Sequence, residues 1–563
     1  MAQICGLRST SAFRSILCAL LAATACSSGS GSPPTSTGGY LQGGNQALGG
    51  TVSAGGAAGD EGGAGGNAPS GGNSGEVGSG GRATGGTSAG SSTSNASGGG
   101  SGGTTATGGA FGSGGKAASG GTVSVGGSLG AGGVTPAGGS PASGGSTGTG
   151  GSAGACVPSV PSGTAYYASP TGSGSTCSTG SPCSLGTAFG KVAGGVTVYL
   201  RGGTYNGSGY LAISGSGTAA SWAVLSAYPC ELPIVDLGDS SSIGISGTYI
   251  SIRGVAAIHG SAGFGNKWTG GGTTNSNGNL ELINCIADMN SANGIAFRSA
   301  KGVHIKQCIA SHTGWSTTQS WSSGFDIFGA QGTFQDNIVE QSIAFENVDM
   351  QHHSDGSGFI VDDIGTGTTF VNNLGFRNGG SCIRLTTSTG THLINNSCYN
   401  NGLDPGAGSD PTYSQPKTPD EIFFSSSDTT KGAVMYNNLV VATGQGGDAQ
   451  AIFGSGGATL GNNLTNNTNT VDFWADANGT NPDFHLKPTA TNAIGKGTTT
   501  EAPSEDIGFD PKCIAKKAPT GTGVQSWWLY SIDFDYIKSI GGIAQCFHPE
   551  ARTGTPDIGA YAL

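Results

Sequence analysis

The signature Asn284-Cys285-Ile286-Ala287 is an amide side chain followed by small and apolar residues. Counting this copy, it occurs in varied form seven times between residues 280 and 467. The other copies are Gln307-Cys308-Ile309-Ala310, Gln341-Ser342-Ile343-Ala344, Asn373-Leu374-Gly375-Phe376, Asn396-Ser397-Cys398-Tyr399, Asn438-Leu439-Val440-Val441 and Asn463-Leu464-Thr465-Asn466. Three gaps between successive amide residues are 23 or 25 residues long, and the other three are 32 to 42 residues long. Such a period indicates a repeat architecture, with insertions in the longer units.

Each repeat contains short pieces rich in β-branched and aromatic residues, such as Val303-His304-Ile305, separated by Gly, Asn and Ser. No repeat holds the roughly 10 to 12 residues of 3.6-residue periodicity that a helix needs. Two or three short strands per unit predict an all-β fold, a right-handed parallel β-helix, in which equivalent residues of adjacent coils lie about 4.8 Å apart. The column of Asn and Gln then predicts a structural ladder of stacked amides.

The composition is unusual for a globular protein. Of 563 residues, 110 are Gly and only 10% are charged, whereas average proteins have about 7% Gly and about 25% charged residues. The net charge of −11 argues against nucleic acid as a partner. Few charges and many hydroxyl groups are typical of an extracellular protein that handles sugars, and we expect it to act as a monomer.

Residues 1–26 have the pattern of an export signal: Arg8 and Arg14, an apolar run too short to span a bilayer, and small residues before Cys26. This ending resembles a bacterial lipobox, which implies lipidation of Cys26 and an extracellular, outer-membrane lipoprotein; cleavage without lipidation is the alternative. Residues 27–155 are almost all Gly, Ser, Thr and Ala, which predicts a disordered linker. Contact with the membrane would then be through the lipid anchor only.

The folded part is predicted to begin at Cys156, with a β-helix over residues 156–480 and a capping helix near residues 185–192. Its opening, Tyr166-Tyr167-Ala168-Ser169-Pro170 and then Val196-Thr197-Val198-Tyr199-Leu200, resembles the first coil of extracellular β-helix proteins, including family-nine pectate lyases. Near the C-terminus, Asn481-Pro482-Asp483-Phe484 and Pro556-Asp557-Ile558-Gly559 resemble the closing module called choice-of-anchor Q. Residues 481–563 are therefore predicted to form the last coils and the cap of the same solenoid.

Ten cysteines follow the signal, an even number that favours disulfides in an oxidising compartment. Cys177 and Cys183 are predicted to close a small loop. Cys285 and Cys308 occupy the same position in adjacent coils, where the spacing permits a disulfide; a reduced, buried stack is the alternative.

The insertions precede one strand of the longer units, so loops 311–323, 345–357 and 400–420 are predicted to gather on one side, where solenoids bind ligands. Alternation along this strand predicts two outward columns. The first contains Ala296, Asp326, Ile360, Arg384 and Phe423, and the second contains Arg298, Phe328, Asp362, Thr386 and Ser425. Asp326 and Arg384 would lie two coils apart, roughly 10 Å. One shifted residue near Cys382 would exchange the faces.

The order Ser323-Gly324-Phe325-Asp326, then Ser354-Asp355-Gly356-Ser357-Gly358-Phe359, then Ser381-Cys382-Ile383-Arg384-Leu385 resembles the active site of family-nine pectate lyases. The resemblance implies β-elimination on an acidic polysaccharide, in which Ca²⁺ neutralises a uronate carboxylate and a basic side chain removes the adjacent proton. The implied calcium ligands are Asp326, Asp355, Asp362 and Asp363. Arg384, where the family has Lys, is the implied catalytic base or the clamp for the substrate carboxylate.

Trp315, Trp321 and Arg298 are predicted to bind the sugar chain, although the Trp side chains could equally pack within their loops. His352 and His353 are predicted to be solvated. Two other functions remain open: a non-enzymatic surface or adhesion protein that binds glycans, and a glycoside hydrolase that uses a pair of carboxylates.

Overall fold

The computed structural model describes residues 156, 159, 163–207, 209, 211–238, 242–266, 278–319, 321–328, 334–362, 366–407, 409, 420–425, 432–442, 450–454, 457–467 and 472–563. All of them belong to one compact unit, Gly126–Leu563. The predicted signal, Cys26 and the linker lie outside the described residues, as does Asp363. No helix within the described ranges is long and apolar enough to cross a membrane.

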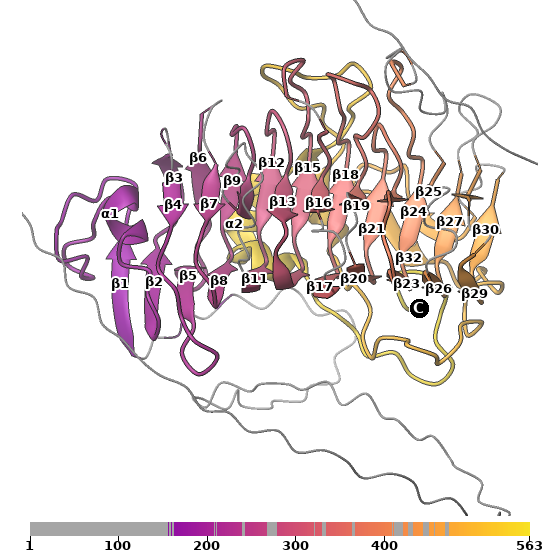
Figure 1. Ribbon diagram of the computed structural model, residues 1–563, viewed down its shortest axis with the longest axis horizontal. Helices are drawn as coiled ribbons and strands as arrows, with labels where there is room; N and C mark the ends of the chain where they lie inside the picture. The colour runs from indigo at the N-terminus through magenta and orange to yellow at the C-terminus, as the bar shows by residue number, and fades with distance from the viewer. Residues whose placement is uncertain are drawn as a thin grey trace, which may run out of the picture. The chain divides into compact units, whose positions relative to one another are not determined.

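The repeats form a parallel β-helix, as predicted, with three sheets that extend along the coil (Figure 1). The 11-stranded sheet consists of β1 (Thr164–Ala168), β2 (Val196–Leu200), β5 (Ala223–Ala227), β8 (Ile250–Arg253), β11 (Gly278–Ile283), β14 (Lys301–Lys306), β17 (Phe334–Glu340), β20 (Thr366–Val371), β23 (His392–Ile394), β26 (Val434–Tyr436) and β29 (Thr459–Gly461). The ten-stranded sheet consists of β3 (Gly203–Asn206), β6 (Pro233–Asp236), β9 (Ala256–Ile258), β12 (Ile286–Asp288), β15 (Ile309–Ser311), β18 (Ile343–Phe345), β21 (Leu374–Phe376), β24 (Ser397–Tyr399), β27 (Leu439–Val441) and β30 (Leu464–Asn466). The nine-stranded sheet consists of β4 (Leu211–Ile213), β7 (Ile243–Ile245), β10 (Phe264–Asn266), β13 (Ile295–Arg298), β16 (Phe325–Phe328), β19 (Phe359–Asp362), β22 (Ile383–Leu385), β25 (Ile422–Phe424) and β28 (Ile452–Phe453).

Helix α1 (Leu185–Phe189) lies at the N-terminal end of the coil, where the sequence predicts a cap (Figure 1). The side chain of Ser184 accepts a hydrogen bond from the backbone N–H of Thr187, which satisfies one of the free donors of the first turn. Leu185, Ala188 and Phe189 are buried. The helix therefore covers apolar surface that would otherwise be open to water at the end of the solenoid.

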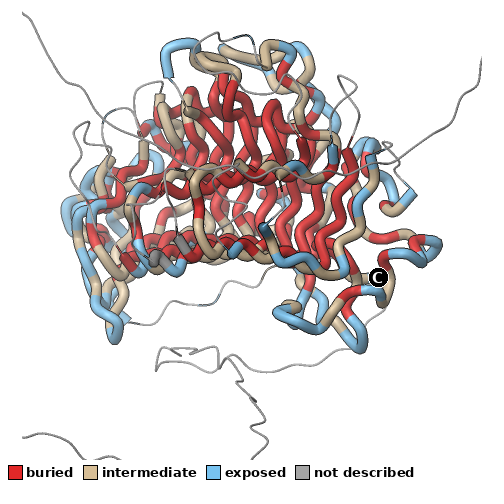
Figure 2. The backbone as a smooth tube through the Cα atoms, turned by 45° about the vertical axis from the view of Figure 1, so that its right-hand side comes forward, coloured by how far each residue is buried: buried red, intermediate tan, exposed pale blue. Residues whose placement is uncertain are grey.

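Inward side chains stack from coil to coil and fill the interior, which Figure 2 shows as a band of buried segments. The rings of Phe325 and Phe359 lie parallel with centroids 4.8 Å apart, the spacing of adjacent strands. Complete burial of one such side chain stabilises the fold by about 1.5–3 kcal/mol. Repetition of this column, coil after coil, is the main source of apolar burial in the fold.

The amide ladder forms, but as two columns, and the sequence alignment was wrong by one residue between Gln341 and Asn373. The outer column has a left-handed backbone at every position and contains Asn284, Gln307, Gln341, Asn372, Asn395, Asn437 and Asn462. The inner column contains the next residue in each case, Cys285, Cys308, Ser342, Asn373, Asn396, Asn438 and Asn463. The slip arose because Asn-Asn pairs begin at residue 372, so an amide is present in both columns from there on.

In the inner column each Asn binds the next. Both the backbone N–H and Nδ2 of Asn373 donate to Oδ1 of Asn396, at 3.0 Å each. Asn396 donates in the same way to Asn438, at 3.0 and 2.9 Å. A second ladder, at the corner before the nine-stranded sheet, joins Asn347, Asn378 and Asn401 and ends at Glu421, whose Oε1 accepts the backbone N–H of Asn401 at 3.0 Å. Buried polar groups at both corners are thus paired along the coil axis.

The described cysteines are either paired in disulfides or free and buried. Cys177 and Cys183 form the predicted disulfide. Cys285 and Cys308 are free and buried, so the reduced stack, the second of the two alternatives, is correct. The remaining disulfides of the described residues are Cys156–Cys230, Cys382–Cys398 and Cys513–Cys546.

Residues 472–563 do not add coils, which corrects the prediction for residues 481–563. They form the antiparallel pairs β31 (Trp474–Asp476) with β32 (Asp483–Leu486) and β33 (Ile514–Ala515) with β34 (Ser531–Ile532), the helix α2 (Phe534–Ile540) and the 3₁₀ turns η1 (Pro511–Cys513) and η2 (Ile543–Cys546). This segment, yellow in Figure 1, packs on the outer face of the ten-stranded sheet. The outer face of this sheet is apolar: it includes Ile286, Ile309 and Ile343, which the C-terminal segment buries completely. A sheet that is apolar on both faces must be covered on both sides.

A buried group of charges fastens the C-terminal segment to the coil. The ring of His312, which has no exposed surface, contacts Asp288 at 2.7 Å, Glu346 at 3.2 Å and the backbone oxygen of Tyr530 at 2.9 Å. Glu346 also pairs with Arg377 at 2.8 Å and accepts the backbone N–H of Tyr530 at 3.2 Å. Burial lowers the pKa of His312, but the carboxylates of Asp288 and Glu346 raise it by more, so that the pKa is about 9.

Candidate active site

Both predicted outward columns lie on the nine-stranded sheet in the predicted register. Strand pairing places Ala296, Asp326, Ile360, Arg384 and Phe423 side by side in successive coils. Arg298, Phe328 and Asp362 form the start of the second column. Asp326 and Arg384 therefore lie on one face, two coil steps or roughly 10 Å apart. No shift occurs at Cys382, because Ile383 pairs directly with Phe359 and Ile422.

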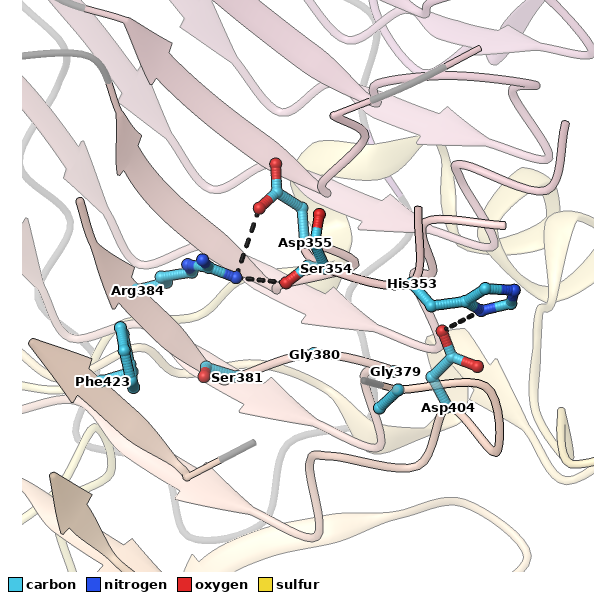
Figure 3. A pocket seen from close by; sticks show the side chains of 10 residues that line it. His353, Ser354, Asp355, Gly379, Gly380, Ser381, Arg384, Asp404 and Phe423 are labelled. Atoms are coloured by element: carbon cyan, nitrogen blue, oxygen red, sulfur yellow. Dashed lines mark hydrogen bonds and ion pairs between the residues drawn. The ribbon is translucent and has the colours of Figure 1, made fainter. Parts of the chain in front are cut away.

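Arg384 is held by the second inserted loop. Its Nη1 lies 3.3 Å from Oδ1 of Asp355 and donates to the backbone oxygen of Ser354 (Figure 3). Its Nε donates to the hydroxyl of Thr386 at 3.3 Å, and its guanidinium faces the ring of Phe423 at 5.4 Å. The side chain is only 9% exposed. Arg384 thus forms a buried ion pair with Asp355.

The carboxylates around Arg384 are buried and repel one another. Burial raises the pKa of Asp355 to about 7 against the opposing effect of Arg384, and Asp349 and Asp362 add to the rise. Burial also raises the pKa of Asp326 well above its usual range, and the charges of Asp362 and Asp355 raise it further. Within the described residues, Oδ1 of Asp326 and Oδ1 of Asp349 are buried without a hydrogen-bond partner. This face therefore carries more buried carboxyl groups than Arg384 alone can pair with.

A calcium ion suits these groups in chemistry and charge. Carboxylate oxygens are the ligands that Ca²⁺ prefers, and two buried carboxylate oxygens here need either a cation or a proton. In the described part of the chain, however, no three His, Cys, Asp or Glu side chains come close enough together to hold a metal ion. The charges of Asp355 and Asp362 act on Asp326, but among the described residues these three side chains do not converge as ligands of one ion.

The three predicted sugar-binding residues do not lie in one site. Trp321 and Arg298 line one groove of about 320 Å³ over β10, β13 and β16. Trp315 does not reach it: its Nε1 donates to the backbone oxygen of Met289 at 3.1 Å, and its ring packs with Val348 and the C-terminal Trp528. Its role is loop packing, the alternative that the sequence left open.

A pair that sequence analysis missed lies in the same pocket as Arg384. Nδ1 of His353 and Oδ2 of Asp404 are 2.8 Å apart (Figure 3), and both residues line the pocket with Asp355 and Phe423. His353 is only 21% exposed and has a left-handed backbone, so the prediction that it is solvated is wrong. The two residues come from different inserted loops, 51 positions apart, and no sequence pattern joins them.

The pocket around Arg384 has a volume of about 20 Å³, close to the room that a single water needs. Nη1 of Arg384 is already engaged by Asp355 and the backbone oxygen of Ser354, so a ligand carboxylate that binds Nη1 would compete with them. The chemistry available here is recognition of an anion by a guanidinium beside carboxylates that can hold a cation or a proton.

No family model and no curated protein sequence matches this chain. Among solved structures, the chain is similar to pectate lyase Pel9A, with 17% identity and a TM-score of 0.45 over 62% of this chain and 96% of that one. It is also similar to a rhamnogalacturonan lyase (16%, TM-score 0.35, 60% of this chain and 97% of that one). A third is an alginate lyase from Paenibacillus sp. str. FPU-7 (13%, TM-score 0.30, 53% of this chain and 99% of that one). At these identities and TM-scores the likeness concerns the coiled fold alone.

Proposed function

We propose that this protein is a polysaccharide lyase that cleaves an acidic polysaccharide by calcium-assisted β-elimination on the outer face of the nine-stranded sheet. The observation that carries the proposal is the shared column of Asp326 and Arg384. An acidic polymer can bind where a guanidinium pairs with its carboxylate and nearby protein carboxylates hold a cation. Arg384 and Asp326, two coils apart, offer one group of each kind.

In the proposed reaction, the uronate carboxylate of the substrate binds Arg384 in place of Asp355. A base removes the C5 proton, the electron pair forms the C4–C5 double bond, the glycosidic C4–O bond breaks, and the leaving oxygen takes up a proton. Asp326, Asp355 and Asp362, with Asp363, would hold Ca²⁺, which when bound neutralises the uronate carboxylate and so acidifies the C5 proton.

Arg384 has two candidate roles, clamp and base. A guanidinium does not readily give up its proton in a protein. Its contacts with Asp355 and Ser354 further favour the charged clamp. Substitution by Lys separates the roles: a clamp loses bidentate geometry and KM rises, whereas a base is replaced by an amine that deprotonates more easily and kcat is kept or increased.

The test is to incubate the purified chain with polygalacturonate and with alginate, with Ca²⁺ or with a chelator, and to follow unsaturated product by ultraviolet absorbance. We expect product only with Ca²⁺, and a loss of about 100-fold or more in kcat/KM for Arg384→Ala. Arg253→Ala, an exposed arginine on the 11-stranded sheet, is the matched control and should retain activity. Absence of calcium-dependent product from acidic polymers would overturn the proposal.

A glycoside hydrolase is the second candidate, and the raised pKa of Asp355, about 7, favours it because a carboxyl that keeps its proton near neutrality can act as a general acid. It predicts new reducing ends without the unsaturated product, and no requirement for Ca²⁺. Glycan binding with neither product would instead indicate an adhesion protein.

The proposed location is the outside of the cell, with the monomeric domain tethered through a lipid on Cys26. Four disulfides in the described residues support an oxidising compartment. Labelled palmitate should be incorporated into the wild-type chain and not into Cys26→Ala. Incorporation into neither chain would instead indicate that the signal is cleaved without lipidation.

A further inference from the structure

A groove separate from the Arg384 pocket lies on the same face of the nine-stranded sheet, toward the N-terminal end of the coil. It has a volume of about 320 Å³, and the residues that line it include Asn266 on β10, Ala296 and Arg298 on β13, and Phe328 on β16. Gln319 and Trp321, from the first inserted loop, form its wall.

The groove exists because the outward column carries no large side chain in these coils. Gly265 and Ala296 occupy the positions that Asp326, Ile360 and Arg384 take further along. A Cβ on Gly265 would lie 2.3 Å from the backbone oxygen of Ala296, a distance that excludes any side chain. The floor of the groove is therefore bare backbone and methyl groups, and it leads directly to Asp326 in the next coil.

Two observations place the groove beside the candidate active site. Arg298 on β13 and Asp326 on β16 lie on adjacent paired strands, and the charge of Arg298 opposes the rise of the pKa of Asp326. The ring of Trp321 lies 4.9 Å from that of His352, in the loop that carries Asp355. The groove thus lies beside the carboxylate cluster, one coil step from Asp326 on the same face of the sheet.

The lining identifies the chemistry of the ligand. An indole ring, the side-chain amide of Gln319 and a single guanidinium suit a sugar ring that carries a negative charge. Three coil steps separate the strand of Arg298 from that of Arg384, a distance of about 14 Å along the axis. An extended acidic chain that bound both arginines would have to cover this distance.

We propose that the groove is a remote subsite for the same acidic polysaccharide, with Arg298 binding the carboxylate of a sugar three coil steps from Arg384 and Trp321 stacking on that sugar. The inference depends on the proposed function for the identity of the polymer. It adds that the substrate lies along the coil axis and that recognition requires an oligomer long enough to fill both sites.

The experiment compares binding and cleavage of galacturonate oligomers of increasing length by the full chain, with wild type, Arg298→Ala, Trp321→Ala and the control Arg253→Ala. For wild type and the control, affinity should increase when the oligomer becomes long enough to reach the groove. Arg298→Ala and Trp321→Ala should lose about tenfold in affinity for long oligomers, the equivalent of about 1.4 kcal/mol, while short oligomers bind as they do to wild type. Unchanged thermal unfolding of both variants would show that they fold.

The outcomes separate the two proposals. Equal length dependence in Arg298→Ala and Arg253→Ala would overturn the subsite, whether or not the protein cleaves. Length-dependent binding that needs Arg298, without any unsaturated product, would overturn the lyase and keep the subsite. Arg298→Ala and wild type should bind long neutral galactan with equal affinity, because that polymer has no carboxylate; weaker binding by Arg298→Ala would contradict recognition of a carboxylate.

Discussion

The inner Asn ladder and the group of carboxyl side chains around Asp326 are both sets of buried polar residues on the same coil. In the ladder, Asn373, Asn396 and Asn438 each donate twice to the next residue. In the carboxyl group, Asp326 has an oxygen that is buried without a partner among the described residues. Stacked amides satisfy one another, because an amide both donates and accepts, whereas neighbouring carboxylates can only accept. The ladder therefore stabilises the coil, and the carboxylates need a cation, a proton or a ligand.

The largest expected effect is on the ladder. Asn396→Ala removes the acceptor for two donors of Asn373 and the donors that reach Asn438 and the backbone oxygen of Phe370. Each buried group left without a partner costs about 1–3 kcal/mol, so we expect a loss of about 4 kcal/mol or more in the free energy of unfolding, measured by denaturant titration.

The control for this variant is Asn463→Ala at the last rung, where the residue that accepts from Asn438 is only half-buried. Because water can replace the missing acceptor there, the loss should be clearly smaller. Equal losses at the two rungs would mean that the ladder is not stabilised by pairing along its axis.

The second prediction concerns a buried charged group in which every member is paired. His312 has its pKa raised to about 9 from the usual 6.5 by Asp288 and Glu346. A raised pKa means that the folded state holds the proton more tightly than the unfolded chain, so this stabilisation is complete below pH 6.5 and is lost as the pH rises to about 9. Unfolding temperature measured from pH 6 to pH 9.5 should fall in this window in the wild type.

His312→Gln should be less stable at pH 6, because Asp288 loses its buried cation and Glu346 keeps only Arg377, and it should lose the pH-dependent fall. His392→Gln is the control, since His392 pairs with Glu501 at a site where both side chains are 35% exposed. The same pH profile in wild type and His312→Gln would contradict the charge assignment.

The sequence predicts the coil well because its determinants are local and repeated. Alternation alone gives the register of Asp326, Arg384 and Phe423, and inward apolar residues leave little freedom to shift. The one slip, at Asn372-Asn373, occurs where two adjacent positions carry the same side chain and the pattern cannot distinguish them.

The site is less predictable because inserted loops and the C-terminal segment determine it. His353 meets Asp404 only through the packing of two loops, and Gly406 lies so close to the ring of His353 that a Cβ there would lie 2.4 Å from Nδ1. Trp315 is taken out of the groove by residues more than 200 positions later, including Trp528. Such contacts have no period, so no repeat analysis can find them.

The smallest effect, opposite in sign, is expected at Asp326. Burial and neighbouring carboxylates raise its pKa, so the folded state resists its ionisation and stability decreases as the pH rises above about 4, the usual pKa of Asp. Asp326→Asn should therefore be more stable than wild type at pH 7 with a chelator present, by about 1 kcal/mol, with a smaller difference at pH 4. Asp236→Asn, at a side chain that is 43% exposed, should show neither change.

Calcium sharpens the same test. If Asp326 helps to hold Ca²⁺, the ion should raise the unfolding temperature of the wild type, since a ligand that binds only the folded state stabilises it. The unfolding temperature of Asp326→Asn should then remain nearly unchanged by Ca²⁺. The variant would then be stable and inactive, which is the expected behaviour when a residue is retained for function at a cost in stability. A variant that is destabilised at pH 7 would show instead that Asp326 has a structural partner, and the contrast with the Asn ladder would no longer hold.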